Sequence, residues 1–204
     1  RRIYFRLIDQ GVHNINLVNP THFTEAILDS LDGGLPVPVV WNTGGYERVE
    51  TLKAFEGRVD VYLPDLKYMD SAQALRYSGA EDYPETARAA ILEMFRQVGP
   101  VRLDENGIIQ RGVIIRHLIL PGQVGAARAV MDWVAEHFSP GEVLFSLMSQ
   151  YVPLGRAGQF REIDRPLRKA EGRSAAAYME NLGLEGFTQE MTAASAQYVP
   201  NFDF

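Results

Sequence analysis

The segment LPDLKYMD, residues 63–70, places an acid and a base, Asp65 and Lys67, directly after an apolar run. In an extended chain the two side chains lie on the same face, because residues two apart point to the same side. A lysine ammonium in such a pair can hold the carboxylate of a charged small molecule. On an open surface the same pair forms an ion pair of little energetic value. Whether the pair binds a ligand or is only a surface ion pair therefore depends on where the fold places these two residues.

Other polar candidates stand at the ends of apolar runs, and Arg116 stands inside one, GVIIRHLIL, where a charge needs a partner or a pocket. Asn19 can be only a helix cap, and Gly44 with Gly45 can be only a turn. Two residues without Cβ also allow a ligand to approach the backbone closely. The candidate residues, in chain order, are Asn19, Thr21, His22, Asn42, Thr43, Gly44, Asp65, Lys67, Arg116 and Gln150.

The elements that must position these residues follow from the hydrophobic pattern. Short, nearly continuous apolar runs predict strands covered on both faces, and helical patterns lie between them. This alternation predicts an α/β fold with a parallel sheet and right-handed crossovers, either a full or partial β/α barrel or an open doubly wound sheet. The predicted strands are 13–18, 37–41, 59–63, 112–120 and 142–148, and the predicted helices are 20–33, 46–55, 84–98, 124–138 and 162–181.

Three smaller features complete the expected organisation. Residues 101–112 predict a hairpin insertion, and residues 186–189 a last short strand. The opening sequence RRIYFRLIDQG is typical of the last turns of a helix, so we expect that the native protein begins further upstream. In parallel α/β folds the site forms at the carboxyl ends of the strands, so we expect the candidate residues to gather at one face.

Composition excludes several classes of function. The net charge is −6 with no block of like charges, which argues against a nucleic acid or an anionic membrane as partner. No apolar run approaches the about 18 residues of a spanning helix, and we expect a soluble cytoplasmic protein. The chain has no cysteine, which excludes disulfides and thiolate-held metals within these residues. The histidines lack metal-ligand spacing, so no metal site is expected.

The ordered segments HNINLVNPTH, VVWNTGGYE, VYLPDLKY, IIRHLILPG and SLMSQYVP resemble the radical SAM superfamily, in the branch related to pyruvate formate-lyase activating enzyme. The resemblance covers nearly the whole chain and is closest to activating enzymes of that branch whose target is unassigned. It implies a partial (β/α)6 TIM-like barrel, truncated here at its N-terminal side. Residues 1–160 would form the barrel core, and residues 161–204 a C-terminal helix and tail packed on it.

The resemblance also implies a chemistry. In that superfamily a 4Fe–4S cluster on a C-x-x-x-C-x-x-C loop binds S-adenosylmethionine and cleaves it reductively to a 5′-deoxyadenosyl radical. In the activating enzymes this radical abstracts hydrogen from a glycine of a partner glycyl-radical enzyme, with flavodoxin or ferredoxin as electron donor. Because this chain has no cysteine, the cluster ligands are expected upstream of Arg1 and the chain alone is expected to be inactive.

The resemblance assigns the candidate residues to cofactor binding. The G-G-E-P turn of the family falls on residues 19–22, where its glycines and its acid are replaced, so this assignment rests on position alone. The D-T-N-G element falls on residues 41–44, and D-x-K is matched by Asp65 and Lys67. Arg116 with Pro121-Gly122 matches R-x-x-x-P-G, and Gln150 closes the last strand. Asn and Thr suit ribose hydroxyls, and Arg116 or Lys67 suits the methionine carboxylate.

Two other functions stay open. A cofactor-free barrel lyase or aldolase could use Lys67 as a Schiff-base amine, which would explain the absence of cysteine. A non-catalytic module that binds S-adenosylmethionine or a protein partner would also need no cluster. A cysteine loop encoded upstream of Arg1 would favour the radical enzyme over both.

Overall fold

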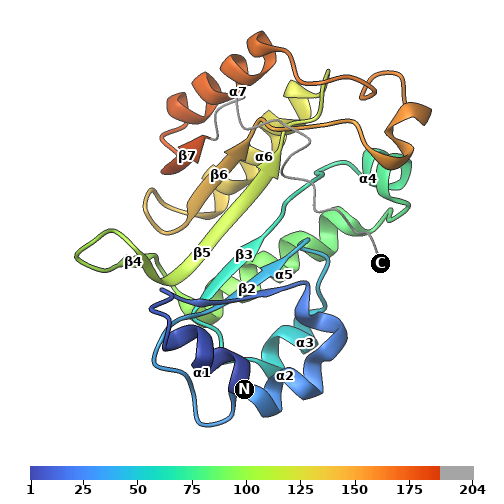
Figure 1. Ribbon diagram of the computed structural model, residues 1–204. Helices are drawn as coiled ribbons and strands as arrows, with labels where there is room; N and C mark the ends of the chain where they lie inside the picture. Colours follow the sequence, from blue (N-terminus) through green and yellow to red (C-terminus); the bar gives the residue numbers. More distant parts are fainter. Residues whose placement is uncertain (189–204) are drawn as a thin grey trace. The chain divides into compact units, whose positions relative to one another are not determined.

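The computed structural model describes residues 1–188 and has an α/β fold with a mostly parallel sheet (Figure 1). The chain divides into two compact units. The N-terminal unit contains residues 1–115 and 141–144, and the C-terminal unit contains, of the described residues, 116–140 and 145–188. The division falls within strand β5 (Ile109–Leu118).

The sheet confirms the predicted parallel architecture. Its strand order is β1-β2-β3-β5-β6-β7, and β4 pairs with β5 in the antiparallel sense expected of the hairpin insertion. The register pairs Val18 with Asn42 and Asn42 with Leu63, so the first three strands end side by side. The strands are β1 (Ile15–Val18), β2 (Val39–Thr43), β3 (Val61–Pro64), β4 (Arg102–Leu103), β5 (Ile109–Leu118), β6 (Leu144–Met148) and β7 (Gly186–Thr188).

The helices of the N-terminal unit follow the prediction with two differences. Residues 20–33 form a 3-10 turn, Pro20–Phe23, before α2, and Asn19 precedes that turn without making the expected side-chain cap. Helix α4 was not predicted. Helices α3 and α5 pack together beside β3 (Figure 1). The helices are α1 (Arg2–Ile8), α2 (Thr24–Leu31), α3 (Val49–Ala54), α4 (Ser71–Ser78) and α5 (Tyr83–Val98).

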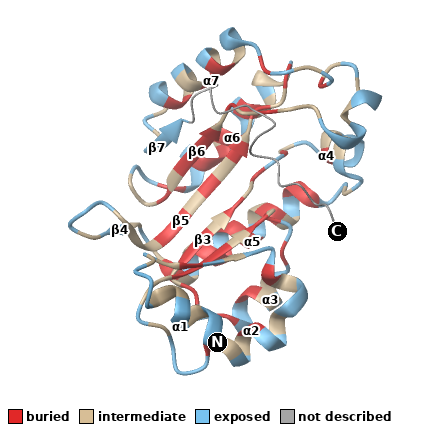
Figure 2. Ribbon diagram, viewed as in Figure 1, coloured by how far each residue is buried: buried red, intermediate tan, exposed pale blue. Residues whose placement is uncertain are grey.

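The core of the N-terminal unit lies between the strands and the helices α3 and α5. Figure 2 shows the buried residues concentrated on β2, β3 and the inner side of α5. The rings of Trp41 and Phe55 are both fully buried, with centroids 4.4 Å apart. Burial of such aromatic side chains dominates the hydrophobic stabilisation of a core.

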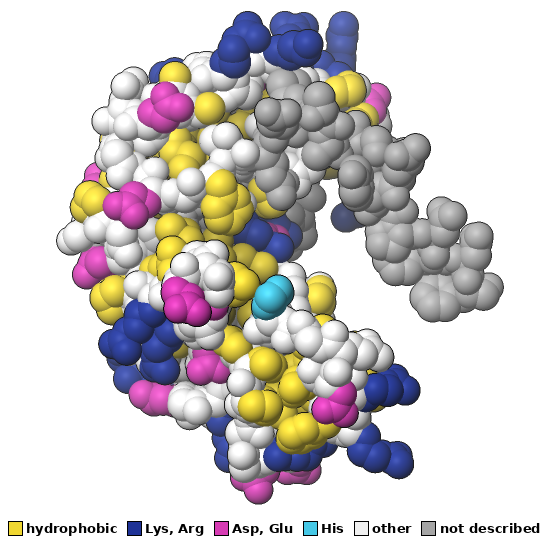
Figure 3. All heavy atoms as spheres, turned by 60° about the vertical axis from the view of Figure 1, so that its left-hand side comes forward, with side chains coloured by type: hydrophobic (Ala, Val, Ile, Leu, Met, Phe, Trp, Pro, Cys, Tyr) yellow, Lys and Arg dark blue, Asp and Glu magenta, His cyan; other side chains and the backbone are white. Residues whose placement is uncertain are grey.

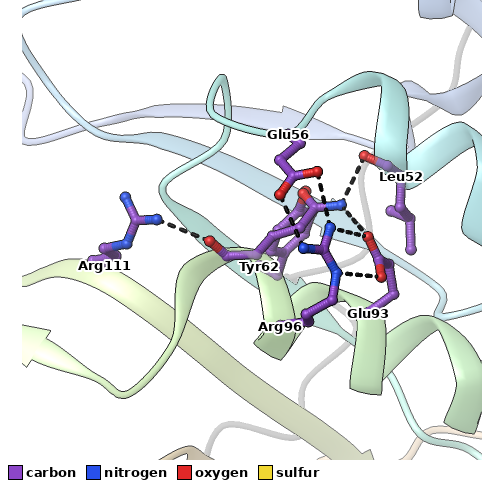
Figure 4. Close-up of polar contacts among 7 residues, drawn as sticks. Leu52, Glu56, Tyr62, Glu93, Arg96 and Arg111 are labelled. Carbon is purple, nitrogen blue, oxygen red and sulfur yellow. Dashed lines mark hydrogen bonds and ion pairs between the residues drawn. The ribbon is translucent and has the colours of Figure 1, made fainter.

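A polar network ties α5 to α3 and β3 (Figure 4). The Arg96 guanidinium donates two hydrogen bonds of 2.8 Å to the carboxylate of Glu93, which is only 7% exposed, and a third of 3.0 Å to Glu56. Gln97 donates to Glu93 at 2.8 Å and accepts from the Tyr62 hydroxyl at 2.6 Å. The hydrogen bond from Arg96 lowers the pKa of Glu93 to about 2, so its carboxylate stays charged at neutral pH.

The C-terminal unit packs α6 (Val124–His137) against α7 (Lys169–Asn181). The Tyr178 hydroxyl donates to Asp132 at 2.6 Å, and Arg128 donates to Ser174 at 3.1 Å. Helix α7 starts seven residues later than the predicted 162, because Pro166 cannot continue a helix from residue 162. A 3-10 turn, Gly155–Gln159, precedes it.

Acidic, basic and hydrophobic side chains are interspersed on the face shown in Figure 3. Within residues 1–188, no helix is both long enough and apolar enough to cross a membrane. The aromatic tail YVPNFDF, which was predicted to pack on the domain, lies outside the described residues.

Candidate functional site

The carboxyl ends of β1, β2 and β3 bring most of the candidate residues together. The Asn19 amide donates to the Asn42 carbonyl at 2.8 Å, and the Asp65 amide donates to the Thr43 carbonyl at 2.9 Å. These bonds extend the parallel ladders by one residue beyond the strands. The candidate residues of three neighbouring strand ends, which span positions 19 to 67, therefore form one continuous backbone surface.

The first strand end is strained at Asn19. Its φ of 48° and ψ of 52° lie in the left-handed region, and among the described residues it is the only non-glycine with positive φ. Asparagine tolerates this conformation better than most residues, and such outliers cluster at functional sites. Thr21 and His22 follow on the 3-10 turn, where His22 is exposed.

The carboxylate of Glu47 joins the first two strand ends. Its side chain is buried, with 3% exposure, and it accepts from the Thr21 hydroxyl at 2.6 and 2.7 Å and from the Thr43 hydroxyl at 2.5 Å. Trp41 Nε1 lies 3.5 Å from the same carboxylate. A buried carboxylate needs such donors. The hydrogens of Thr21 and Thr43 thus point to Glu47, and each hydroxyl can offer a ligand only a lone pair.

The second and third strand ends touch at Gly45. This residue has a φ of +82°, and a Cβ built on it would lie 2.0 Å from the Asp65 carbonyl oxygen. Only glycine permits this approach. The Gly44-Gly45 pair therefore has a structural reason, in addition to any role in ligand binding.

Asp65 and Lys67 lie on the same side of the turn that follows β3. Lys67 Nζ is 3.6 Å from Asp65 Oδ2, with side-chain exposures of 45% and 20%, respectively. A Cβ on Gly44 would lie 3.5 Å from the same Nζ. The ammonium is thus held over the Gly44 backbone and is reachable from solvent. A pair at this distance and exposure contributes little to stability, so the ammonium can exchange partners readily.

The remaining candidates, Arg116 and Gln150, belong to the C-terminal unit. Arg116 lies on β5 with a buried Nε atom, and His117, on the opposite face, is only 3% exposed. Gln150 follows β6, and its buried Oε1 atom has no hydrogen-bond partner among the described residues. Such an atom suits a ligand donor such as an amino group.

The Pro121-Gly122 turn of the same unit is fixed by Glu171 at the start of α7. Its carboxylate accepts from the Gly122 amide at 2.7 Å and from two nitrogens of Arg165 at 2.7 and 2.9 Å. The hydrogen bond from Arg165 is the main reason why the pKa of Glu171 falls to about 2.

Two residues that organise the strand ends were not singled out from sequence: Glu47 and Tyr83. Glu47 lies in the segment WNTGGYE, and a carboxylate four residues after Thr43 is the only signal that could have indicated it. Tyr83 begins α5, and its hydroxyl contacts the backbone of both turns. Nothing in the sequence places it there.

A pocket of about 440 Å³ lies at the opposite, amino ends of β2 and β3. It is lined by residues 31–35, Val39, 56–58 and Asp60. In parallel sheets binding sites form at the carboxyl ends. The pocket therefore does not coincide with the candidate site.

The donor set fits S-adenosylmethionine but not an iron–sulfur cluster. Lys67 can receive a carboxylate, and Asp65 and the turn carbonyls can receive an ammonium group. The chain has no cysteine, and no group of three His, Asp or Glu side chains within residues 1–188 could hold a metal ion. Thiolate ligands for a cluster cannot come from these residues.

Comparison with known proteins agrees with this geometry at the level of the fold. No protein-family profile matches the chain. It is 28% identical over 176 residues to an uncharacterized protein of Methanocaldococcus jannaschii, which takes in 84% of this chain and 47% of that protein. The chain thus spans about half the length of this curated relative.

The fold is similar to that of a domain of pyruvate-formate lyase-activating enzyme from Bacteroides vulgatus. The TM-score is 0.57, with 14% identity, and the match covers 87% of this chain and 98% of that domain. The predicted α/β fold class is thereby confirmed. At this identity the likeness concerns the fold, and the site residues stay a prediction.

Proposed function

We propose that this chain supplies the S-adenosylmethionine-binding part of a radical SAM protein of the pyruvate formate-lyase activating type. The observation that carries the proposal is the Asp65–Lys67 pair beside Gly44 at the carboxyl ends of parallel strands. Similarity of the fold to an activating-enzyme domain supports it. A glycyl-radical enzyme as substrate and flavodoxin or ferredoxin as electron donor belong to the same proposal.

The proposed roles divide the ligand among the strand ends. The Lys67 ammonium binds the methionine carboxylate, and the Asp65 carboxylate with the neighbouring carbonyls binds the amino group. Asn42 and Thr43 face the ribose hydroxyls, with Thr43 acting as an acceptor because its hydrogen points to Glu47. Asn19, Thr21 and His22 line the first strand end. Arg116 and Gln150, which belong to the C-terminal unit, stay predicted cofactor-binding residues.

Bound S-adenosylmethionine would supply 5′-deoxyadenosyl radical chemistry, for which an iron–sulfur cluster held outside these residues would be needed. The residues present would bind and orient the ligand. No step at the cluster is assigned to them, because the chain has no thiolate.

The aldolase alternative is disfavoured by the surroundings of Lys67. A Schiff-base lysine must react as a neutral amine, which an apolar, desolvated pocket favours. Lys67 is instead 45% exposed and lies beside a carboxylate. Borohydride reduction in the presence of a ketoacid would trap Lys67 if that alternative held.

The proposal is tested by binding of two ligands that differ in the amino-acid part and in the charge on sulfur. S-adenosylmethionine carries the carboxylate, whereas 5′-methylthioadenosine lacks it. Lys67→Gln removes one charged contact of about 1.4 kcal/mol, so its Kd for S-adenosylmethionine should rise about tenfold. Its Kd for 5′-methylthioadenosine should not change.

The matched control is Lys53→Gln, on the exposed surface of α3, which should leave both dissociation constants unchanged. Saturation-transfer NMR measures weak binding of both ligands. Equal weakening of both ligands by Lys67→Gln, or no binding of either ligand to the wild-type chain, would contradict the proposal.

A further inference from the structure

The hydroxyl of Tyr83 contacts the backbone of two strand-end turns at once. It lies 2.9 Å from the Gly44 carbonyl oxygen, 2.9 Å from the Asp65 carbonyl oxygen and 3.1 Å from the Lys67 amide nitrogen. Tyr83 is the first residue of α5 and is only 4% exposed. A side chain from a helix thus holds together the turn after β2 and the turn after β3.

The hydrogen-bonding capacity of a phenol fits this position. One O–H is shared by the two carbonyls, and a lone pair accepts from the Lys67 amide. Burial raises the pKa of Tyr83 above its usual value, so the hydroxyl keeps its hydrogen over the pH range in which proteins are stable. The hydroxyl therefore remains a hydrogen-bond donor at physiological pH.

The ring is fixed from two sides, which leaves the hydroxyl little freedom. Tyr46 stacks on it with centroids 5.8 Å apart, and Tyr68 meets it edge-on at 5.6 Å. Tyr46 is itself anchored by a 2.6 Å hydrogen bond from its hydroxyl to Asp82, directly before α5. The position of the two turns is thus set by α5 and its aromatic neighbours.

The geometry points to Tyr83 as a positioning residue: through its three backbone contacts it sets where the Lys67 ammonium stands over Gly44 for recognition of a ligand carboxylate. The identity of that ligand as S-adenosylmethionine rests on the proposed function. The positioning of Lys67 does not. Loss of the hydroxyl would free the Lys67 amide and both carbonyls without removing the ring.

Tyr83→Phe tests this inference, with Tyr68→Phe as the matched control. Tyr68 belongs to the same aromatic cluster and loses a comparable hydrogen bond, of 3.0 Å to Ser78, which does not involve the turns. We expect Tyr83→Phe to weaken S-adenosylmethionine binding about tenfold, as loss of a well-placed charged contact does. Binding of 5′-methylthioadenosine should change less than twofold, and Tyr68→Phe should change neither.

A second readout does not depend on the ligand. The lysines of the chain are Lys53, Lys67 and Lys169, so reductive methylation with ¹³C-formaldehyde gives an NMR spectrum that is simple to assign. Tyr83→Phe should move the Lys67 signal and leave the other two in place, whereas Tyr68→Phe should move none. If Tyr83→Phe does not fold, hydrogen exchange of the Lys67 amide in the wild-type protein tests the inference instead. Rapid exchange of this amide would refute its hydrogen bond to the Tyr83 hydroxyl.

The outcomes separate this inference from the proposed function. If the wild type binds S-adenosylmethionine and both variants bind equally well, the positioning role is wrong and the proposed function stands. If the wild type does not bind, the proposed function fails and the lysine spectrum decides: a shift of Lys67 in Tyr83→Phe alone supports positioning. An unchanged Lys67 signal overturns it.

Discussion

Replacement of Glu47 tests whether one buried carboxylate joins the first two strand ends. Glu47→Ala would leave the hydroxyls of Thr21 and Thr43 and the indole of Trp41 without their shared acceptor. Hydrogen bonds to a charged group contribute about 1.5–3 kcal/mol each, and an unsatisfied buried donor costs about 1–3 kcal/mol. Because the indole contact is long, at 3.5 Å, we count only the two hydroxyls and expect a loss of about 3–5 kcal/mol.

Glu47→Gln should cost less, because the amide keeps one acceptor oxygen and the Thr21 hydroxyl can accept from its nitrogen. We expect Glu47→Gln to lower the free energy of unfolding by about 1–2 kcal/mol, which is the difference between charged and neutral hydrogen bonds. For a chain of this length 1 kcal/mol lowers the Tm by about 2–4 °C. Glu50→Gln, on the exposed side of α3, is the control and should change neither the free energy of unfolding nor the Tm.

Urea unfolding followed by tryptophan fluorescence measures these losses. Trp41 lies against Glu47, and the other tryptophan, Trp133, can be replaced by Phe so that Trp41 alone reports. The expected order of stability is wild type, Glu47→Gln, Glu47→Ala. Wild-type stability of Glu47→Ala would show that the carboxylate is not the shared acceptor.

Two further predictions concern the backbone contact and the charged network. Gly45→Ala should lower the free energy of unfolding by more than about 2 kcal/mol, because its Cβ would meet the Asp65 carbonyl, whereas Gly57→Ala, with a φ of +75° and open space, should cost only about 1 kcal/mol of strain. Equal losses in thermal unfolding would contradict the close contact. The pKa of Glu93 is lowered from 4.5 to about 2, so its stabilisation is present above pH 4.5 and is lost as the pH falls through about 2. Glu93→Gln should therefore be about 1–2 kcal/mol less stable at pH 7, a value discounted because Arg96 is half-exposed, and urea titrations should show this gap closing between pH 4.5 and 2. A gap that is constant over that range would exclude the assigned titration.

The hydrophobic pattern predicted the strands and most helices because apolar runs and helical spacing report burial directly. Helix α4 was missed because only Ala74 of its residues is buried, although Asp70 and Gly79 cap its two ends. Residues 162–168 were predicted helical, but Pro166 lacks the backbone donor that a helix interior needs, and α7 begins at Lys169.

The candidate site was predictable only where its residues follow a strand. Asn42 and Lys67 could be found in this way, since each follows a predicted strand. Glu47 and Tyr83 could not, because their importance comes from contacts with Thr21 and with backbone groups 16 to 39 residues away. Hydrogen bonds of this kind leave no periodicity in the sequence.

The claim that the carboxyl ends of β1, β2 and β3 bind S-adenosylmethionine is tested most directly by mapping amide chemical shifts during a titration with this ligand. We expect the amide signals of Asn42, Gly44, Gly45 and Lys67 to shift together, with a single dissociation constant. The amide signals of residues 31–35, which line the pocket at the other end of the strands, should not shift. Shifts confined to residues 31–35, or no shifts at ligand concentrations in the millimolar range, would show that these strand ends do not bind the ligand.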